Sequence, residues 1–265
     1  MWPDNETDID LLGFEFLVDE LLVLLKEPRV LPVTIGIAGD WGSGKSSILK
    51  MGARQLRAEG DGEFLVVEFS PWRFEDYEDV KAALLAAVLD AVRARAEKDP
   101  DEDRKTKLVK LVKRLILRVR WLPLARMGAA ALLKAHTDLT AEQVALMTSP
   151  VITADLEAKQ EEALKQLDTE DKPSAEVATI AEFRDTFHEL MEALQVSALV
   201  VLVDDLDRCL PDTIINVFEA IRLFLHVPKT AFVIAADHRI VQAAVEHAYP
   251  EAVKSDPSIG TDYLE

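Results

Sequence analysis

The sequence predicts an α/β fold in which a parallel sheet is flanked by helices. Short apolar runs alternate with longer segments of helical spacing over residues 1–97 and 181–265. Strands that alternate with helices form parallel sheets covered on both faces. Residues 98–180 contain almost no glycine and no β-branched run long enough to predict a strand. We therefore expect one core, made by the first and last parts of the chain, with a helical insertion between them.

The elements of the first part follow from spacing and residue type. Phenylalanine and leucine at helical spacing predict a helix over residues 13–27. It should end before Pro28, because a proline disfavours helix at the preceding residue. The β-branched run 32–38 predicts a buried strand. The other expected elements are a loop at 39–44, a helix at 46–59, a strand at 64–69 and a helix at 76–96.

The second part repeats this alternation. Residues 197–203 are the most hydrophobic strand-like run of the chain and predict a strand buried on both faces. The other expected elements are helices at 182–195, 211–226 and 238–248 and a strand at 231–236.

Composition excludes several classes of protein. The 265 residues carry a formal net charge of −18. That balance argues against a general nucleic-acid coat, although a local basic patch remains open. One cysteine, Cys209, cannot form an internal disulfide framework or a four-cysteine zinc site. The N-terminus does not resemble a signal peptide and no apolar stretch is long enough to span a membrane. We expect a cytoplasmic protein.

Residues 39–46 read Gly-Asp-Trp-Gly-Ser-Gly-Lys-Ser and fit the Walker A pattern G-x-x-x-x-G-K-[ST] between an expected strand and helix. Glycines let backbone N–H groups surround phosphates, and the helix N-terminus favours the anion. Lys45 should reach the β- and γ-phosphates, and Ser46 should ligate Mg²⁺. The chain is therefore expected to be a P-loop NTPase. The predicted nucleotide-binding residues are Gly39, Asp40, Trp41, Gly42, Ser43, Gly44, Lys45, Ser46 and Ser47.

A second motif follows the strand 197–203. Asp204 and Asp205 end this hydrophobic run, as in a Walker B motif. Asp204 should hold Mg²⁺ together with Ser46. Asp205 stands where many P-loop ATPases place the carboxylate that activates water, although aspartate is shorter than the commoner glutamate. The alternative is a pair of turn acids at a strand end. The predicted catalytic residues are Lys45, Asp204 and Asp205.

Other polar residues also follow expected strands. Arg73 and Arg208 lie where ligands of open α/β sheets bind, and either could stabilise phosphate charge or pair with a nearby carboxylate. Asp237 could sense the γ-phosphate or cap the helix that follows it. The sequence leaves these alternatives open.

Three segments together resemble the KAP family of P-loop NTPases. They are 39–46, the Phe-Ser-Pro-Trp-Arg-Phe run at 69–74, and the Val-Asp-Asp-Leu-Asp-Arg-Cys run at 203–209. The resemblance covers about residues 10–97 and 181–265, and the last two segments are its most specific part. It implies a sheet of the ASCE type, in which a later strand inserts between the two motif strands.

The resemblance also implies an activity. It implies ATP hydrolysis with Mg²⁺, coupled to conformational change or assembly, through Lys45, Ser46, Asp204 and Asp205. No Asn-Lys-x-Asp motif for reading guanine is present, in agreement with ATP. Many family members carry transmembrane helices between the two motifs. The charged insertion of this chain instead resembles soluble bacterial members, several of which act in phage exclusion or antiphage defence, including the ATPase of Qat-type systems.

The end of the chain departs from the family pattern. Residues 263–265 look like the start of a segment, so we expect the core to be truncated. A fifth strand and an arginine that acts across subunits would then be missing.

The insertion begins with a basic stretch. Residues 104–137 hold ten lysines or arginines and no acids, with apolar residues interleaved. This stretch could contact a partner, an anionic membrane surface or nucleic acid, or pack against acidic neighbours within the protein. The leading hypothesis for the whole chain is an active ATPase, a motor or switch, that acts with protein partners or as a homo-oligomer. The alternatives are a nucleotide-dependent scaffold with little turnover and a membrane-associated adaptor.

Overall fold

The computed structural model describes residues 7–10, 12–59, 63–74, 80–118, 176–224 and 226–251. Within these ranges the chain alternates strands and helices, as the sequence predicts. The elements, in chain order, are α1 (Glu15–Lys26), β1 (Val33–Ala38), α2 (Lys45–Ala58), β2 (Phe64–Phe69), the 3₁₀ turn η1 (Pro71–Phe74), α3 (Val80–Glu97), α4 (Glu102–Arg118), α8 (Glu176–Leu194), β3 (Ala198–Val203), the 3₁₀ turn η2 (Leu206–Arg208), α9 (Pro211–Phe224), β4 (Thr230–Ala236) and α10 (His238–Ala248).

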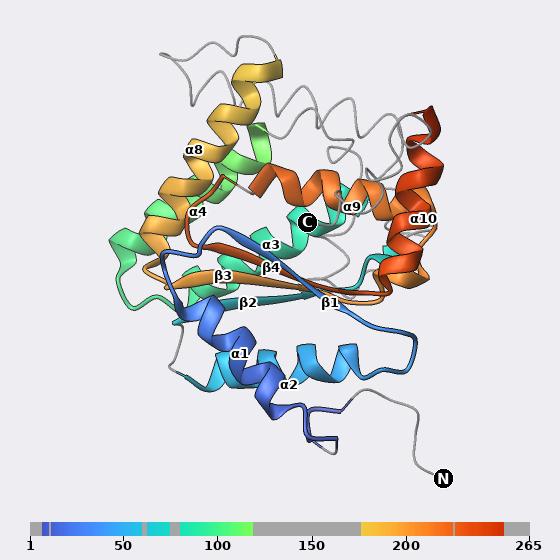
Figure 1. Cartoon of the computed structure of the whole chain (residues 1–265). Coiled ribbons are helices and arrows are strands. Elements are labelled where there is room, and N and C mark those ends of the chain that lie inside the picture. The colour runs from blue at the N-terminus through green and yellow to red at the C-terminus, as the bar shows by residue number, and fades with distance from the viewer. Residues whose placement is uncertain are drawn as a thin grey trace, which may run out of the picture.

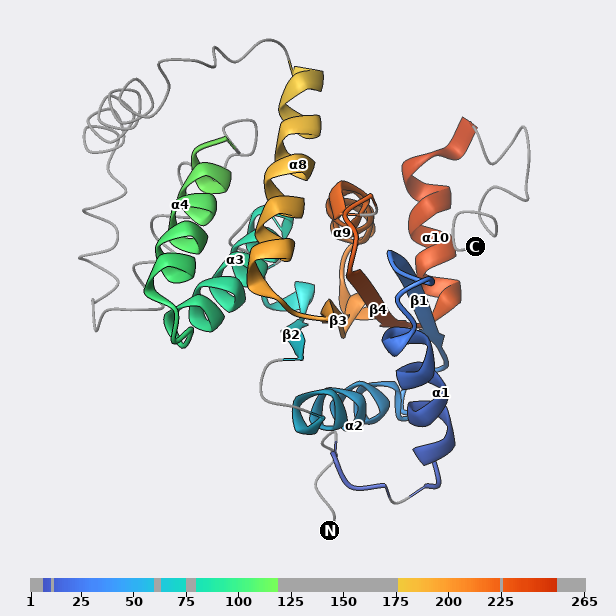
Figure 2. The same ribbon diagram turned by 90° about the vertical axis from the view of Figure 1, so that its left-hand side faces the viewer.

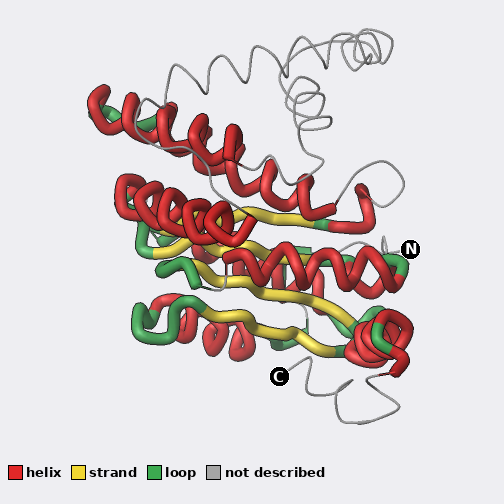
Figure 3. The backbone as a smooth tube through the Cα atoms, turned by 90° about the horizontal axis from the view of Figure 1, so that it is seen from above, coloured by secondary structure: helices red, strands yellow, loops and turns green. Residues whose placement is uncertain are grey.

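The four strands form one parallel sheet in the order β1-β4-β3-β2. Figure 3 shows the strands of this sheet side by side in yellow. Strand β4 therefore lies between β1, which precedes the glycine-rich loop, and β3, which ends in the acid pair. This is the inserted strand that the family resemblance implies, so the predicted fold class is confirmed. Because all four strands are parallel, their carboxyl ends lie at one edge of the sheet.

The two central strands are the most apolar, for a physical reason. Every residue of β3 and β4 is buried, because helices cover both faces of the sheet there. Strand β1, at the edge of the described sheet, alternates between half-buried and exposed residues. The hydrophobic run at 197–203 thus reflects a central position in the sheet.

Helices form a layer on each face of the sheet (Figures 1 and 2). Helices α1 and α2 lie on one face and pack with it into the smaller core. Helices α3, α4, α8, α9 and α10 contribute to the larger core on the other face. An aromatic cluster lies within this larger core; its members are Phe183, Phe187, Phe224 and Phe232.

Helix α4 holds the first half of the basic stretch. Its apolar residues Leu108, Leu111, Val112 and Leu115 are buried in the larger core, where α4 packs against α3 and α8. This part of the stretch therefore uses its apolar side within the chain and is not free to insert it into a membrane. The remainder of the stretch, residues 119–137, lies outside the described residues.

Some boundaries differ from the prediction. Helix α8 begins at Glu176, earlier than expected, because residues 176–181 continue its turns without a breaker. The start expected for α3 falls among residues 75–79, which lie outside the described residues. No described helix is long and apolar enough to cross a membrane.

Candidate nucleotide site

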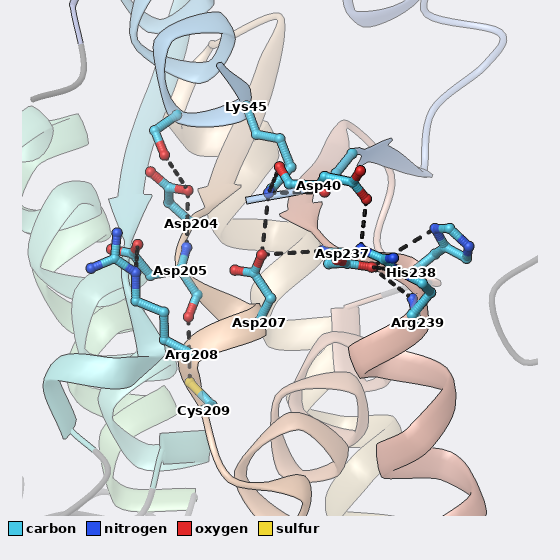
Figure 4. Close-up of polar contacts among 12 residues, drawn as sticks. Asp40, Lys45, Asp204, Asp205, Asp207, Arg208, Cys209, Asp237, His238 and Arg239 are labelled. Carbon is cyan, nitrogen blue, oxygen red and sulfur yellow. Dashed lines mark hydrogen bonds and ion pairs between the residues drawn. The ribbon is translucent and has the colours of Figure 1, made fainter. Parts of the chain in front are cut away.

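Four turns meet at the carboxyl edge of the sheet, and the predicted site residues lie in these turns or in the first turn of α2. The four turns are the loop 39–44 after β1, the turn η1 after β2, the turn η2 after β3, and the junction between β4 and α10. The turns η1 and η2 contact each other. Figure 4 shows the polar contacts between the loop, η2 and the start of α10.

The backbone of the loop requires glycine. Gly42 and Gly44 adopt φ angles of 76° and 90°, which side chains of L-residues disfavour. A Cβ atom on Gly44 would also lie 2.4 Å from Cε2 of Phe14. The conformation of the loop therefore depends on these two glycines, and α2 begins directly after it at Lys45.

The segment before α1 lies against this loop, which the sequence analysis did not predict. The carboxylate of Asp10 accepts four backbone N–H groups from residues 12–15 at 2.7–3.1 Å. These bonds, that from Phe14 above all, lower the pKa of Asp10 below its ordinary value. The turn they hold places Phe14 on the loop, and the N–H of Thr7 donates to Oγ of Ser47 at 3.3 Å. The signal in the sequence is an aspartate just before a helix.

The two predicted metal ligands meet. Oγ of Ser46, in the first turn of α2, donates to Oδ1 of Asp204 at 3.0 Å. A second hydrogen bond fixes the orientation of the Asp204 side chain, because its Oδ1 also accepts the N–H of Asp205 at 2.9 Å. Mg²⁺ is commonly held by one or two protein oxygens together with substrate phosphates and water. A hydroxyl beside a single carboxylate fits that requirement. Among the described residues, no group of three or more His, Cys, Asp or Glu side chains could hold a metal ion.

Lys45 is buried, and three oxygens surround its ammonium group. Nζ donates to the carbonyl oxygens of Gly39 at 3.0 Å and Asp40 at 3.1 Å. It also lies 3.2 Å from Oδ2 of Asp207, in an ion pair whose two side chains are about one-tenth exposed. The sequence predicts a nearby carboxylate as a partner for Arg208 but does not indicate this pairing of Asp207 with Lys45. The signal was the third acid of the Asp-Asp-Leu-Asp run.

Asp205 has a left-handed backbone and an engaged carboxylate. Its φ is 57°, which aspartate tolerates better than most residues. Oδ1 lies 2.7 Å from Nε of Arg208, and Oδ2 accepts a hydrogen bond from Oγ of Ser70 at 3.3 Å. The guanidinium of Arg208 also lies over the ring of Trp72, 5.7 Å from its centroid. The sequence left two alternatives for Arg208, and the structure contains the pair with a nearby carboxylate. Arg73 is exposed.

Asp237 caps α10 and anchors a further cation. Its carboxylate accepts the backbone N–H of Arg239 at 3.0 Å and pairs with the Arg239 guanidinium, which also reaches Asp40 of the loop at 2.6 Å. The Arg239 side chain is the main cause that lowers the pKa of Asp237 to about 2, and Asp237 in turn raises the pKa of Arg239. The capping alternative for Asp237 is thus present. Arg239 was missed, although it follows the strand closely in the sequence.

The remaining predicted residues are less engaged. The Trp41 side chain, at the tip of the loop, is 74% exposed. Ser43 closes the loop through its N–H, which donates to the carbonyl of Asp40 at 3.1 Å. Cys209, which is not among the predicted site residues, is buried, and its Sγ donates to the carbonyl oxygen of Asp205 at 3.6 Å.

This fold and site define the class of P-loop NTPases. A glycine-bent loop between β1 and α2 faces a strand-end aspartate across an inserted strand. Within that class, the KAP family P-loop domain matches residues 15–265, and the chain belongs to this family. It is also similar to the phage T7 exclusion protein of Escherichia coli strain K12, with 24% identity over 214 residues. The match covers 81% of this chain and 27% of that protein, so the chain spans about a quarter of its relative's length.

Proposed function

We propose that this chain binds ATP with Mg²⁺ at residues 39–47 and hydrolyses it. The observation that carries the proposal is the hydrogen bond of 3.0 Å between Ser46 and Asp204, which joins the first turn of α2 to the end of β3. Membership of a P-loop family supports nucleotide binding. The buried position of Lys45, next to Ser46 in the sequence, supports a site for phosphate groups.

Each residue has a distinct task in this proposal. The N–H groups of the loop and of the first turn of α2 bind phosphate oxygens. Ser46 and Asp204 hold Mg²⁺, which supplies charge neutralisation between phosphates. Lys45 contributes a further positive charge. Asp205 accepts a hydrogen bond from the attacking water and orients it, once its carboxylate is released from Arg208 and Ser70.

We further propose that the hydrolysis drives a conformational change or assembly in antiphage defence, in the cytoplasm. Residues at the site come from the first turn of α2, the turn after β3 and the start of α10, so a change at the phosphates reaches several elements. The similarity to a protein named for phage T7 exclusion supports the defence role. In this proposal the chain binds ATP and acts together with other proteins or with further copies of itself.

Phosphate release measured with Mg²⁺ and ATP over a series of protein concentrations tests this proposal. We expect turnover by the wild type and its loss in Asp205→Asn, which keeps the shape of the side chain. A steep rise of specific activity with concentration would indicate assembly with a shared site. Turnover that persists at full rate in Asp205→Asn would contradict the assigned role.

A second candidate function is a nucleotide-dependent scaffold with little turnover. It is favoured by one observation, namely that both carboxylate oxygens of Asp205 are engaged, by Arg208 and by Ser70. Calorimetric titration with ATP separates the two functions. Tight binding without phosphate release at any concentration identifies the scaffold, whereas tight binding with release identifies the ATPase.

A further inference from the structure

The surroundings of Lys45 contain a built-in anion. A lysine ammonium group has three N–H donors and no acceptor. In this structure three oxygens lie within reach, the carbonyls of Gly39 and Asp40 and the carboxylate of Asp207. Of the three, the Asp207 oxygen is the one that carries charge. A phosphate oxygen that binds Lys45 must therefore replace one of these partners.

The same carboxylate oxygen of Asp207 has a second contact. Oδ2 accepts the backbone N–H of Asp237 at 3.3 Å, at the junction between β4 and α10. Asp237 in turn holds Arg239, and Arg239 pairs with Asp40 of the loop. The contacts form a closed polar ring from the loop through η2 to the start of α10 and back (Figure 4).

We propose that Asp207 is an internal competitor for Lys45, which nucleotide phosphates displace, and that its displacement is transmitted to the start of α10 through the N–H of Asp237. The inference rests on the proposed nucleotide binding. It adds a regulatory residue to the proposed Mg²⁺ ligands, Ser46 and Asp204, and to Asp205, which is proposed to orient water. Phosphate oxygens and the Asp207 carboxylate are both anionic, so they repel each other beside one ammonium group. The two backbone carbonyls belong to the loop itself and are neutral, which makes Asp207 the partner that leaves.

Calorimetric binding of a non-hydrolysable ATP analogue to Asp207→Asn tests the competition. Asparagine keeps an acceptor for the N–H of Asp237 but removes the charge that holds Lys45. We expect the analogue to bind about tenfold more tightly than it binds the wild type, the size of effect that loss of one charge-assisted contact gives. AMP should bind both proteins equally, because it lacks the phosphates that reach the Walker A lysine.

Asp19→Asn is the matched control, because it makes the same change of charge at an exposed position of α1. It should bind the analogue like the wild type. Equal or weaker binding by Asp207→Asn than by the wild type would overturn the competition, and the assigned site would stand. No binding by any of the three proteins would overturn the nucleotide site, and the competition with it.

Hydrogen–deuterium exchange of the wild type tests the transmission without any variant. The analogue should increase exchange at the β4–α10 junction, residues 236–241, because the N–H of Asp237 loses its acceptor. The loop and the first turn of α2 should become more protected in the same experiment. Protection at the loop with unchanged exchange at residues 236–241 would overturn the transmission.

Discussion

The loop after β1 and the turn after β3 lie at the same edge of the sheet, yet they are held in place in different ways. The loop 39–44 owes its shape to its own backbone, with positive φ angles at Gly42 and Gly44. The turn that begins at Asp205 also has a positive φ, but at an aspartate, and side-chain contacts from other segments hold it. One element is specified locally and the other by its neighbours.

This difference explains what the sequence can reveal about each. A backbone that needs glycine at fixed positions leaves a spacing that can be read without a structure. The carboxylate of Asp205 is held by Ser70 and Arg208, and that of Asp207 holds Lys45. The sequence shows these acids, but the role of each depends on contacts that only the fold creates. The motif of the loop therefore predicts its function residue by residue, while the motif of the turn predicts a site without assigning every acid.

The largest effect should come from Lys45, where the two elements meet. Lys45→Ala removes the ammonium group beside the phosphates, and we expect ATP turnover to fall by about 10²–10³-fold, as for loss of one donor that stabilises charge. Steady-state phosphate release measures it. Lys26→Ala, an exposed lysine on α1 that pairs with Glu59, is the control and should keep wild-type turnover. Full turnover in Lys45→Ala would show that the site assignment is wrong.

The loop 39–44 should be destabilised by a substitution that its backbone conformation does not allow. Gly44→Ala places a side chain at φ 90° with its Cβ against Phe14, so we expect the free energy of unfolding to fall by about 2 kcal/mol or more. Denaturant unfolding measures the change. Adding Phe14→Ala should recover the part that is due to the clash but leave the backbone strain.

Gly36→Ala, in β1, is the matched control for this change. A Cβ atom there meets nothing within 4 Å and the φ angle is not positive. Its free energy of unfolding should equal or slightly exceed that of the wild type, because alanine restricts the unfolded chain. Equal destabilisation by both substitutions would show that glycine at position 44 is not required by conformation.

The fold was largely predictable, because its signals are local. Strand runs of β-branched residues and helices of regular spacing place all four described strands within one residue of the prediction. The family resemblance implied that a later strand lies between the two motif strands, but it did not place β2 at the edge of the sheet. What could not be predicted was the packing of α4, since a basic helix with an apolar side can face a membrane, a partner or its own core. Burial of Leu108 and Leu115 shows that the apolar side of this helix packs in its own core.

Contacts within the site between two motif residues of known role could be predicted from the sequence, but the other contacts could not. The pairing of Ser46 with Asp204 was expected, because each belongs to a motif with a known role. The Asp207–Lys45 pair and the Arg239–Asp40 pair join residues far apart in the chain, and neither has a spacing of its own. The contact of Phe14 with the loop depends on the path of the segment before α1.

The turn after β3 can be tested for its own backbone strain. Asp205→Ala and Asp205→Gly both remove the carboxylate and its bonds to Arg208 and Ser70, so their difference isolates the φ of 57°. We expect the glycine variant to be more stable by about 1 kcal/mol, since alanine disfavours the left-handed region. Thermal or denaturant unfolding measures it. If the alanine variant proves equally stable or more stable, then the turn is not left-handed in solution.

The smallest effect should appear as a pH dependence at the start of α10. The pKa of Asp237 lies at about 2 in the folded protein, below the ordinary value of 3.8, so its stabilising contribution is complete above about pH 4. It is lost as the pH falls from there through 2, because the folded state must then take up the proton.

Asp237→Asn has no such carboxyl but can still cap the helix. The gap in Tm between wild type and variant should therefore narrow between pH 5 and pH 2, and because the Arg239 partner is 62% exposed, solvent keeps that gap small. Asp10, whose pKa is also lowered, titrates in both proteins and cancels from the comparison. A gap that stays constant over this range would show that the ion pair with Arg239 does not hold the Asp237 carboxylate in its charged form.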